Sequence, residues 1–277
     1  MAQMRAIVIT RHGGPEVLEL QDVPAPEPGP GQLLVALEAA GVNYRDVYER
    51  EGGSAHAGGT PSVCGVEGAG TVLESRADEF REGDRVAWVA APGSYAERVV
   101  VDAGGAVALP EGTPSDLAAA VLLQGMTAHY LSHATYPVQA GDDVLVHAAA
   151  GGVGLLLVQM VKRRGGRVIA TTSTEEKARL ARAAGADETI GYEGFGERAR
   201  ELTGGEGVHA VYDGIGATTF DESLSALRPR GYMVLYGAAS GPPEPVDVAR
   251  LNAGSLFLIG RDEDESGCKA REDMRLV

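Results

Sequence analysis

Cysteine is rare in this sequence of 277 residues, and the two cysteines, Cys64 and Cys268, cannot supply a disulfide framework. Two thiols are compatible instead with a reducing cytoplasm. Positive charge is also in deficit, since 24 Lys and Arg against 39 Asp and Glu give a net charge of −15. This balance argues against binding of nucleic acid or other polyanions. The apolar runs are too short for a membrane span, and no signal-peptide pattern is found. We therefore expect a cytoplasmic chain without a nucleic-acid or membrane partner.

The first hundred residues have the pattern of an all-β domain. Hydrophobic residues make up 44% of the chain, and its length fits one large or two medium domains. Short apolar stretches are separated by turn signals such as Glu82-Gly83-Asp84. These stretches predict strands over residues 6–10, 17–22, 33–40, 70–74, 85–90 and 95–101. Short strands at this spacing are typical of a β-barrel or sandwich.

After Pro110 the pattern becomes that of an α/β domain. Apolar positions recur with helical spacing over residues 117–130. From residue 143 predicted strands (143–148, 167–171, 188–190, 208–213, 232–236 and 255–259) alternate with predicted helices (152–164, 174–184, 197–202 and 217–227). This alternation predicts a doubly wound parallel sheet. Ten of the 17 residues in 261–277 are charged, which predicts a disordered or poorly packed tail.

A glycine-rich turn stands at the start of the α/β pattern. The run Ala149-Ala150-Gly151-Gly152-Val153-Gly154 follows a predicted strand and opens a predicted helix. In this context Ala149, Gly151 and Gly154 take the three glycine places of the dinucleotide fingerprint. Glycine at 151 lets the backbone approach a pyrophosphate, glycine at 154 lets the helix pack closely on its strand, and the helix N-terminus favours an anion. The alternative is a tight strand-to-helix turn with no ligand.

The end of the second α/β strand indicates which dinucleotide is bound. A fingerprint for NAD usually has Asp or Glu at this place, on the ribose hydroxyls. Here the strand ends in Thr171-Thr172-Ser173, with Lys177 four residues beyond. Hydroxyls and an ammonium group accept a 2′-phosphate, which a carboxylate would repel. We therefore predict NADPH as the cofactor. The alternative for Lys177 is a solvated helix face, and Glu175 and Glu176 weaken the signal.

Several motifs together resemble the medium-chain dehydrogenase/reductase superfamily, and within it the zinc-free quinone oxidoreductase (zeta-crystallin-like) family. They are His-Gly-Gly-Pro-Glu-Val-Leu at 12–18, Gly-Val-Asn-Tyr-Arg-Asp-Val-Tyr at 41–48, Gly-Val-Glu-Gly-Ala-Gly at 65–70, Gly-Asp-Arg-Val at 83–86, and residues 147–154. The resemblance covers residues 5–260. It implies a GroES-like β-barrel, the catalytic and substrate domain, over 1–115 and a Rossmann NADPH-binding domain over 116–260. It also implies that residues 261–277 replace the C-terminal segment with which the family returns to its first domain, so that the chain is shortened.

The residue types predict that no metal takes part. Zinc-dependent relatives have Cys at the position of Asn43 and His at that of Val66, and neither residue here suits a catalytic zinc ion. Glu67 alone does not make a site, and the four cysteines of a structural zinc lobe are missing. Without a Lewis acid to stabilise an alkoxide, alcohol dehydrogenation is disfavoured.

The resemblance assigns roles to further residues. It implies that Asn43, Asp46 and Tyr48 are the catalytic residues and that Tyr44 and Gln124 contact the substrate. Asn43 and Tyr48 can donate hydrogen bonds to a carbonyl oxygen as charge develops on it, and Asp46 positions its neighbours. The alternative for Tyr44 and Tyr48 is a packing pair at i, i+4. The cofactor would be bound by Thr127, Ala149, Ala150, Gly151, Gly152, Val153, Gly154, Ser173, Lys177, Tyr192, Gly237, Ala238 and Arg261.

Histidines offer other catalytic interpretations, which we disfavour. His147 lies under the glycine turn and is expected to be a satisfied interior group. His129 and His133 are spaced i, i+4 and could form half of a metal site, but no third ligand is evident. No Ser/His/Asp triad or Gly-x-Ser-x-Gly motif is found.

The sequence therefore predicts an NADPH-dependent reductase that transfers a hydride to a quinone or similar conjugated carbonyl without a metal. The alternatives are an enoyl or alkenal double-bond reductase of the same fold, a non-catalytic NADPH-binding (crystallin-like) protein, and a chain that folds poorly. The family usually forms dimers through edge strands of its Rossmann sheets, and residues 255–259 are such an apolar edge. We expect a homodimer.

Overall fold

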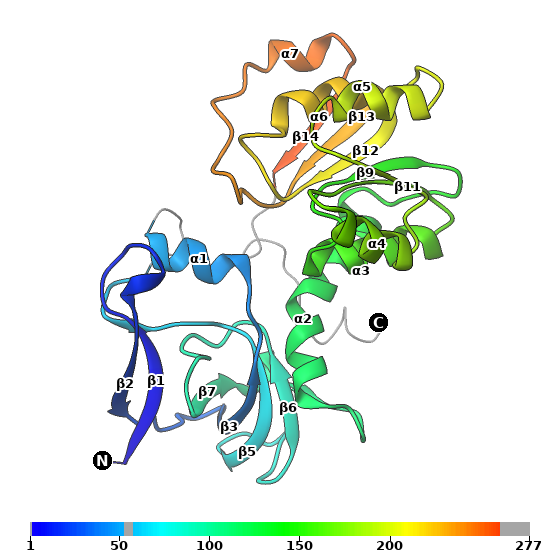
Figure 1. The fold of residues 1–277 in the computed structure, drawn as a ribbon. Helices are drawn as coiled ribbons and strands as arrows, with labels where there is room; N and C mark the ends of the chain where they lie inside the picture. Colours follow the sequence, from blue (N-terminus) through cyan, green and yellow to red (C-terminus); the bar gives the residue numbers. More distant parts are fainter. Residues whose placement is uncertain (1, 53–57, 261–277) are drawn as a thin grey trace. The chain divides into compact units, whose positions relative to one another are not determined.

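The computed structural model describes residues 2–52 and 58–260. The described chain divides into two units, which meet between Leu123 and Gln124 (Figure 1). The charged tail, Cys268 and Arg261 lie outside the described residues. None of the helices within the described ranges is long and apolar enough to cross a membrane.

The first unit consists mainly of antiparallel strands. One sheet has the order β2-β1-β4, with β1 Gln3–Ile9, β2 Leu18–Pro24 and β4 Ser62–Val63. The other has the order β7-β3-β5-β6-β8, with β3 Gln32–Ala40, β5 Gly68–Ser75, β6 Arg85–Trp88, β7 Arg98–Asp102 and β8 Val107–Ala108. Short 3₁₀ turns lie at Pro15–Val17 and Ala103–Gly105. Alternate residues of the second sheet, such as Leu33, Val35 and Trp88, form its core.

One helix of this unit was not among the predicted elements. Helix α1 spans Tyr44–Glu51, where Val47 is the only aliphatic residue, so the apolar periodicity that identifies a helix is weak. Its first turn is stabilised instead by polar contacts, because the Asp46 carboxylate accepts a hydrogen bond from the Asn43 backbone N–H at 2.9 Å. Gly52 ends the helix with a φ of 76°. Our expectation of a first domain without helices was therefore wrong at this position.

The second unit is a parallel sheet of six strands in the order β11-β10-β9-β12-β13-β14. This is the strand order 3-2-1-4-5-6 of a Rossmann domain. The strands are β9 Asp143–Val146, β10 Arg167–Thr171, β11 Glu188–Ile190, β12 Val208–Asp213, β13 Leu227–Leu235 and β14 Phe257–Gly260. Helix α2 Ser115–Tyr130 contains the boundary between the two units. The other helices of the second unit are α3 Gly152–Arg163, α4 Glu175–Ala183, α5 Phe195–Leu202, α6 Phe220–Ala226 and α7 Ala249–Asn252, with a π-helical turn at Leu131–Thr135.

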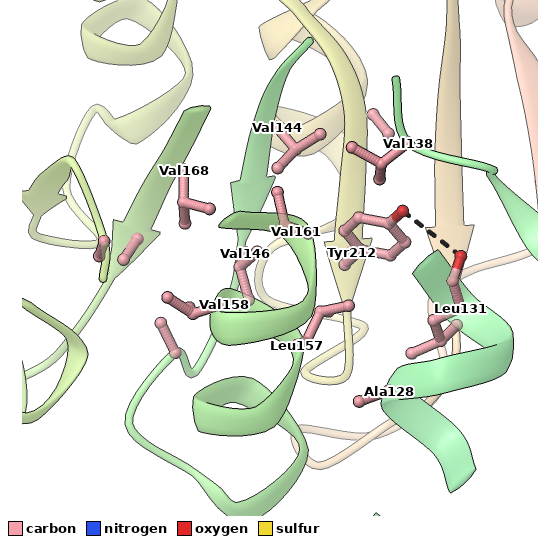
Figure 2. Packing of buried hydrophobic residues seen from close by; sticks show 14 of the residues in the cluster. Ala128, Leu131, Val138, Val144, Val146, Leu157, Val158, Val161, Val168 and Tyr212 are labelled. Carbon is pink, nitrogen blue, oxygen red and sulfur yellow. Dashed lines mark hydrogen bonds between the residues drawn. The ribbon is translucent and has the colours of Figure 1, made fainter. Parts of the chain in front are cut away.

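Helices cover both faces of this sheet, as the continuous apolar strands require. On one face Val144 and Val146 of β9 pack with Leu157 of α3, and Tyr212 donates a hydrogen bond to the Leu131 carbonyl at 3.4 Å (Figure 2). On the other face the intervening residues of the same strands pack against α5 and α6. The alternation of side chains along each strand thus divides the core into two layers.

Strand β13 differs most from the expected boundaries. It begins at Leu227 instead of residue 232, and helix α6 is correspondingly shorter than predicted. The reason is a bulge: Leu227 pairs with Val208, and the register then shifts so that Tyr232 pairs with Ala210. The intervening Arg-Pro-Arg-Gly has the composition of a turn, so the sequence pattern does not predict the first part of this strand. Strand β14 is an edge strand, as expected.

Candidate functional site

The glycine turn joins the central strand β9 to helix α3 and lies at the carboxyl end of the parallel sheet. Ala148 begins it with a φ of 46°, and the Gly151 N–H donates to the Ala148 carbonyl at 2.8 Å. Gly151 is the N-cap of α3. The first N–H groups of α3 have no partner within the helix and face the region just outside the strand ends. This is the geometry in which helix N-termini bind phosphates.

Two glycines of the turn are required by their surroundings. A Cβ on Gly154 would overlap the Ala148 carbonyl and the Ala149 backbone, so α3 could not pack this closely on its strand. A Cβ on Gly152 would overlap the side-chain amide of Gln124. The packing of α3 on its strand therefore depends on glycine at 154, and the close contact of Gln124 with the turn depends on glycine at 152.

A cavity of about 430 Å³ lies beside the turn, entirely within the second unit. Its lining comes from the carboxyl ends of several strands, as ligand sites in open α/β sheets do. The lining residues are Ala148, Lys177, Tyr192, Phe195, Ile215, Thr218, Thr219, Ala239 and Ser240. We refer to it as the rim pocket.

Three residues predicted around a 2′-phosphate lie at or beside the rim pocket. Lys177 and Tyr192 line it directly. The Lys177 ammonium donates to the Ser173 hydroxyl at 3.2 Å, and the Tyr192 hydroxyl accepts a hydrogen bond from the Ala148 N–H at 3.0 Å. The position that usually holds an acid in NAD sites is thus occupied by hydroxyls and an ammonium group that contact one another.

The loops that follow β12 and β13 form the other wall of the pocket. The Ser240 N–H donates to the Ile215 carbonyl at 2.8 Å. A Cβ on Gly237 would lie 2.9 Å from the Gly214 carbonyl oxygen, so the two loops are in close contact here. Gly237 and Ala238, both predicted cofactor residues, lie in the second of these loops, whereas Arg261 falls outside the described residues.

His147 is a fully buried and hydrogen-bonded interior residue, as expected. One ring nitrogen lies 2.8 Å from the Thr171 hydroxyl and the other 2.9 Å from the Ser223 hydroxyl. Burial lowers the pKa of His147 to about 4, although the negative charge of Asp213 acts in the opposite direction. The imidazole is therefore neutral at physiological pH.

In the first unit two of the residues predicted to be catalytic, Asn43 and Asp46, are buried and hydrogen-bonded, whereas Tyr48 is half-buried. The Asn43 side-chain amide donates to the Glu67 carboxylate at 2.6 Å, and the same carboxylate accepts from the Leu123 N–H at 2.7 Å. Glu67 is fully buried. Glycine is needed at 41 because a Cβ there would overlap the Glu67 carboxylate. The Asn43 amide is thus held in one orientation by a buried carboxylate.

Tyr95 supports the start of α1 from a different part of the chain. Its hydroxyl donates to the Asp46 carboxylate at 2.7 Å. Burial raises the pKa of Asp46, and the hydrogen bond from Tyr95 opposes that rise. Burial also raises the pKa of Tyr95. The same Asp46 oxygen accepts from the Asn43 N–H and from Tyr95, and a positioning role for Asp46 stays a prediction.

Tyr44 and Tyr48 contact one another through ring centroids 5.2 Å apart at an interplanar angle of 62°. They therefore form the i, i+4 packing pair considered as an alternative. A role of Tyr44 in substrate binding stays a prediction. Gln124 lies against the glycine turn, as the close approach of its amide to Gly152 requires. Thr127, one turn further along α2, is buried.

No three His, Cys, Asp or Glu side chains gather as a metal site among residues 2–52 and 58–260. His129 and His133 stack on each other with ring centroids 4.2 Å apart. The Cys64 thiol is buried, which raises its pKa to about 12. A reaction without metal stays a prediction from the residue types.

Sequence reasoning missed Tyr95 and the wall of Ile215, Thr218 and Thr219. Tyr95 lies 49 positions from Asp46, and no local pattern indicates that pairing. The sequence does contain a signal for this wall. Val211-Tyr212-Asp213 followed by Gly216 also resembles the zinc-free quinone oxidoreductase family. Gly216 has a φ of 89°, and a Cβ on it would lie 2.5 Å from the Gly241 carbonyl oxygen.

Together the β-rich unit, the six-stranded parallel sheet and the glycine turn define a two-domain dinucleotide-binding protein. Comparisons with known proteins agree. Residues 29–111 match the family model described as the alcohol dehydrogenase GroES-like domain, and residues 152–263 match the one described as zinc-binding dehydrogenase.

Individual relatives specify the family. The chain is 44% identical over 260 residues to a quinone oxidoreductase of Pseudomonas aeruginosa, which covers 92% of this chain and 80% of that protein. It is 42% identical to a 2-haloacrylate reductase of a Burkholderia species, over 91% of this chain and 79% of that protein. The structure of Escherichia coli quinone oxidoreductase complexed with NADPH superimposes with a TM-score of 0.94 at 35% identity, covering 98% of this chain and 86% of the other. The chain belongs to the quinone oxidoreductase family of the medium-chain dehydrogenase/reductase superfamily.

The pKa of His147 leads to a testable prediction. A lowered pKa in the folded state means that the unfolded chain binds a proton below about pH 6.5 that the folded chain does not bind. The stability contributed by this group is therefore complete above pH 6.5 and is lost as the pH falls towards 4. We expect the His147 ring signals in an NMR titration to keep their neutral shifts at pH 5.5. A midpoint at or above 6.5 would contradict the buried, neutral assignment.

Proposed function

We propose that this chain is an NADPH-dependent quinone reductase that needs no metal. The observation that carries the proposal is that the glycine turn contacts Tyr192 of the rim pocket, with Lys177 and Ser173 close by. Tyr192 binds the turn at Ala148, and Lys177 and Ser173 stand where NAD sites have an acid. The relatives support the same conclusion, since one is named a quinone oxidoreductase and a similar structure is a complex with NADPH.

The residues at the rim pocket fit the cofactor. The glycine turn suits a pyrophosphate, because it ends at the N-cap of α3, whose first N–H groups have no partner within the helix. We propose that Ala149, Ala150, Gly151, Gly152, Val153 and Gly154 bind the pyrophosphate, and that Ser173, Lys177 and Tyr192 bind the 2′-phosphate. We further propose that Thr127, Gly237 and Ala238 bind towards the nicotinamide.

When bound, NADPH supplies the hydride that reduces the acceptor. We propose that the side chains of Asn43 and Tyr48 donate hydrogen bonds to the carbonyl oxygen on which negative charge develops. The Glu67 carboxylate orients Asn43, and Asp46 fixes the first turn of the helix that carries Tyr48. Tyr44 and Gln124 contact the acceptor. The one proton that completes the reduction of a quinone after hydride transfer comes from water, so no acidic side chain is required.

A second candidate function is reduction of an activated carbon–carbon double bond. The observation that favours it is the relative named 2-haloacrylate reductase, which is 42% identical to this chain. The same hydride donor and the same hydrogen bonds to a carbonyl oxygen serve both reactions, so the acceptor distinguishes them.

We also propose that the chain works as a homodimer in the cytoplasm. The edge strand β14 supports the dimer, because its apolar Phe257, Leu258 and Ile259 lie at the end of the sheet and Phe257 is 42% exposed. The two cysteines of the sequence, of which Cys64 is buried as a free thiol, suit a reducing compartment.

The direct test is consumption of NADPH by the purified chain with a soluble benzoquinone and, in parallel, with an acrylate or enone. We expect saturable turnover and a higher kcat/KM for the quinone. A higher kcat/KM for the alkene would favour the double-bond reductase. Binding of NADPH without turnover of either acceptor would contradict the reductase and favour a non-catalytic cofactor-binding protein.

Replacing Lys177 tests the choice of cofactor. In Lys177→Ala the 2′-phosphate loses a charge-assisted hydrogen bond at an exposed site, so we expect the KM for NADPH to rise about fivefold to tenfold and the KM for NADH to stay the same. Arg179→Ala is the matched control, because Arg179 lies on the same helix with its side chain 74% exposed. Equal effects on both coenzymes, or an equal effect of Arg179→Ala, would contradict the assignment.

A further inference from the structure

A row of five buried polar side chains lies beneath the rim pocket. Thr171, His147, Ser223 and Asp213 are fully buried, and Thr219 is 2% exposed. The Thr171 and Ser223 hydroxyls contact the two ring nitrogens of His147 at 2.8 and 2.9 Å. Ser223 and Thr219 contact the Asp213 carboxylate at 3.3 and 2.8 Å. The five residues come from β10, the turn after β9, β12 and the start of α6, so the row links separate elements.

The row has a single direction of hydrogen bonding. The Ser223 hydroxyl donates to the Asp213 carboxylate. The Ser223 oxygen is then the acceptor for a proton on Nε2 of His147. Because the imidazole is neutral, Nδ1 carries no proton and accepts from the Thr171 hydroxyl. With Ser223 as the donor to Asp213, the proton of His147 lies on Nε2, and the hydrogen bonds run in one order from Thr171 to Asp213.

Asp213 is a buried carboxylate stabilised by neutral donors. In the described part of the chain its two oxygens accept from the Ile215 N–H at 2.7 Å, the Gly216 N–H at 3.0 Å, and the two hydroxyls. Burying a charge is costly unless hydrogen bonds replace its water. Each of these donors is therefore held firmly in place, and two of them are the backbone of the loop that begins the far wall of the pocket.

The two ends of the row support opposite walls of the rim pocket. At one end His147 precedes Ala148, and its ring lies 4.7 Å from that of Phe195. Ala148 and Phe195 line one side of the pocket, and Ile215 and Thr219, held by Asp213, line the other. We propose that His147 and Ser223 are positioning residues that set the spacing between these walls and thereby the affinity for the dinucleotide. This inference rests on the proposed function of the pocket.

The test compares two buried serines of the same unit. Ser223→Ala removes the link between His147 and Asp213, whereas Ser132→Ala removes an equally buried hydroxyl that bonds the Ala128 carbonyl at 2.8 Å. The dissociation constant of NADPH is measured directly by titration, alongside Tm and kcat at saturating NADPH. We expect Ser223→Ala to weaken NADPH binding about tenfold with kcat changed less than about twofold. Ser132→Ala should lower Tm without changing the dissociation constant.

Equal dissociation constants for Ser223→Ala, Ser132→Ala and the unaltered chain would overturn the inference. Failure of the unaltered chain to bind NADPH would overturn the proposed function instead. If Ser223→Ala does not fold, Thr171→Val removes the hydroxyl that contacts His147 at the His147 end of the row, with a side chain of similar shape, and should weaken binding in the same way. Nitrogen-15 NMR of the unaltered chain provides a separate readout. The row requires a proton on Nε2 of His147, and a proton on Nδ1 would contradict it.

Discussion

The close packing of helix α3 on the turn after β9 is the constraint on which the second unit depends. It requires a position without a side chain, because any Cβ at Gly154 would overlap the Ala148 carbonyl. Once the helix packs at that distance, its N-terminal N–H groups lie at the carboxyl end of the sheet. The rim pocket, the neighbouring Ser173 and the loops after β12 and β13 are all arranged around that helix end. The proposed binding of a phosphorylated dinucleotide follows from this single contact.

Both units use buried carboxylates to hold functional groups in place. Glu67 holds the amide of Asn43 in the first unit, and Asp213 holds the loop that lines the rim pocket in the second. Each carboxylate is satisfied by neutral N–H or O–H donors in the contacts described above. Such an arrangement is costly to bury and stable only when it is complete, so it keeps its donors in fixed positions. Fixed donors are what hydride transfer requires from a protein that supplies no nucleophile of its own.

The α/β unit was the more predictable part of the sequence. Its inner strands are largely buried and rich in apolar residues, so Arg167–Thr171 and Val208–Asp213 have the predicted bounds. The half-buried edge strand Glu188–Ile190 also has the predicted bounds. Polar or irregular elements were harder to predict. Helix α1 has almost no apolar stripe, and the bulge that begins β13 has the composition of a turn.

The candidate site likewise has one part that the sequence predicts and one part that it does not. The glycine turn and Lys177 follow from local pattern, since their chemistry is contained within a few adjacent residues. Contacts between distant positions do not follow from local pattern. Tyr95 approaches Asp46 across 49 positions, and Ser223 approaches His147 across 76. Only the folded chain brings these side chains together.

The most direct test of the account is a titration of the nitrogen-15-labelled chain with NADPH, followed through its backbone amide signals. We expect the largest shifts in the amide signals of residues 149–154 and of the residues around Ser173, Lys177 and Tyr192. NADH should produce the shifts at 149–154 without those around Lys177, because it lacks the 2′-phosphate. If the amide signals of residues 149–154 do not shift when NADPH is added, the claim that the glycine turn binds the cofactor is contradicted.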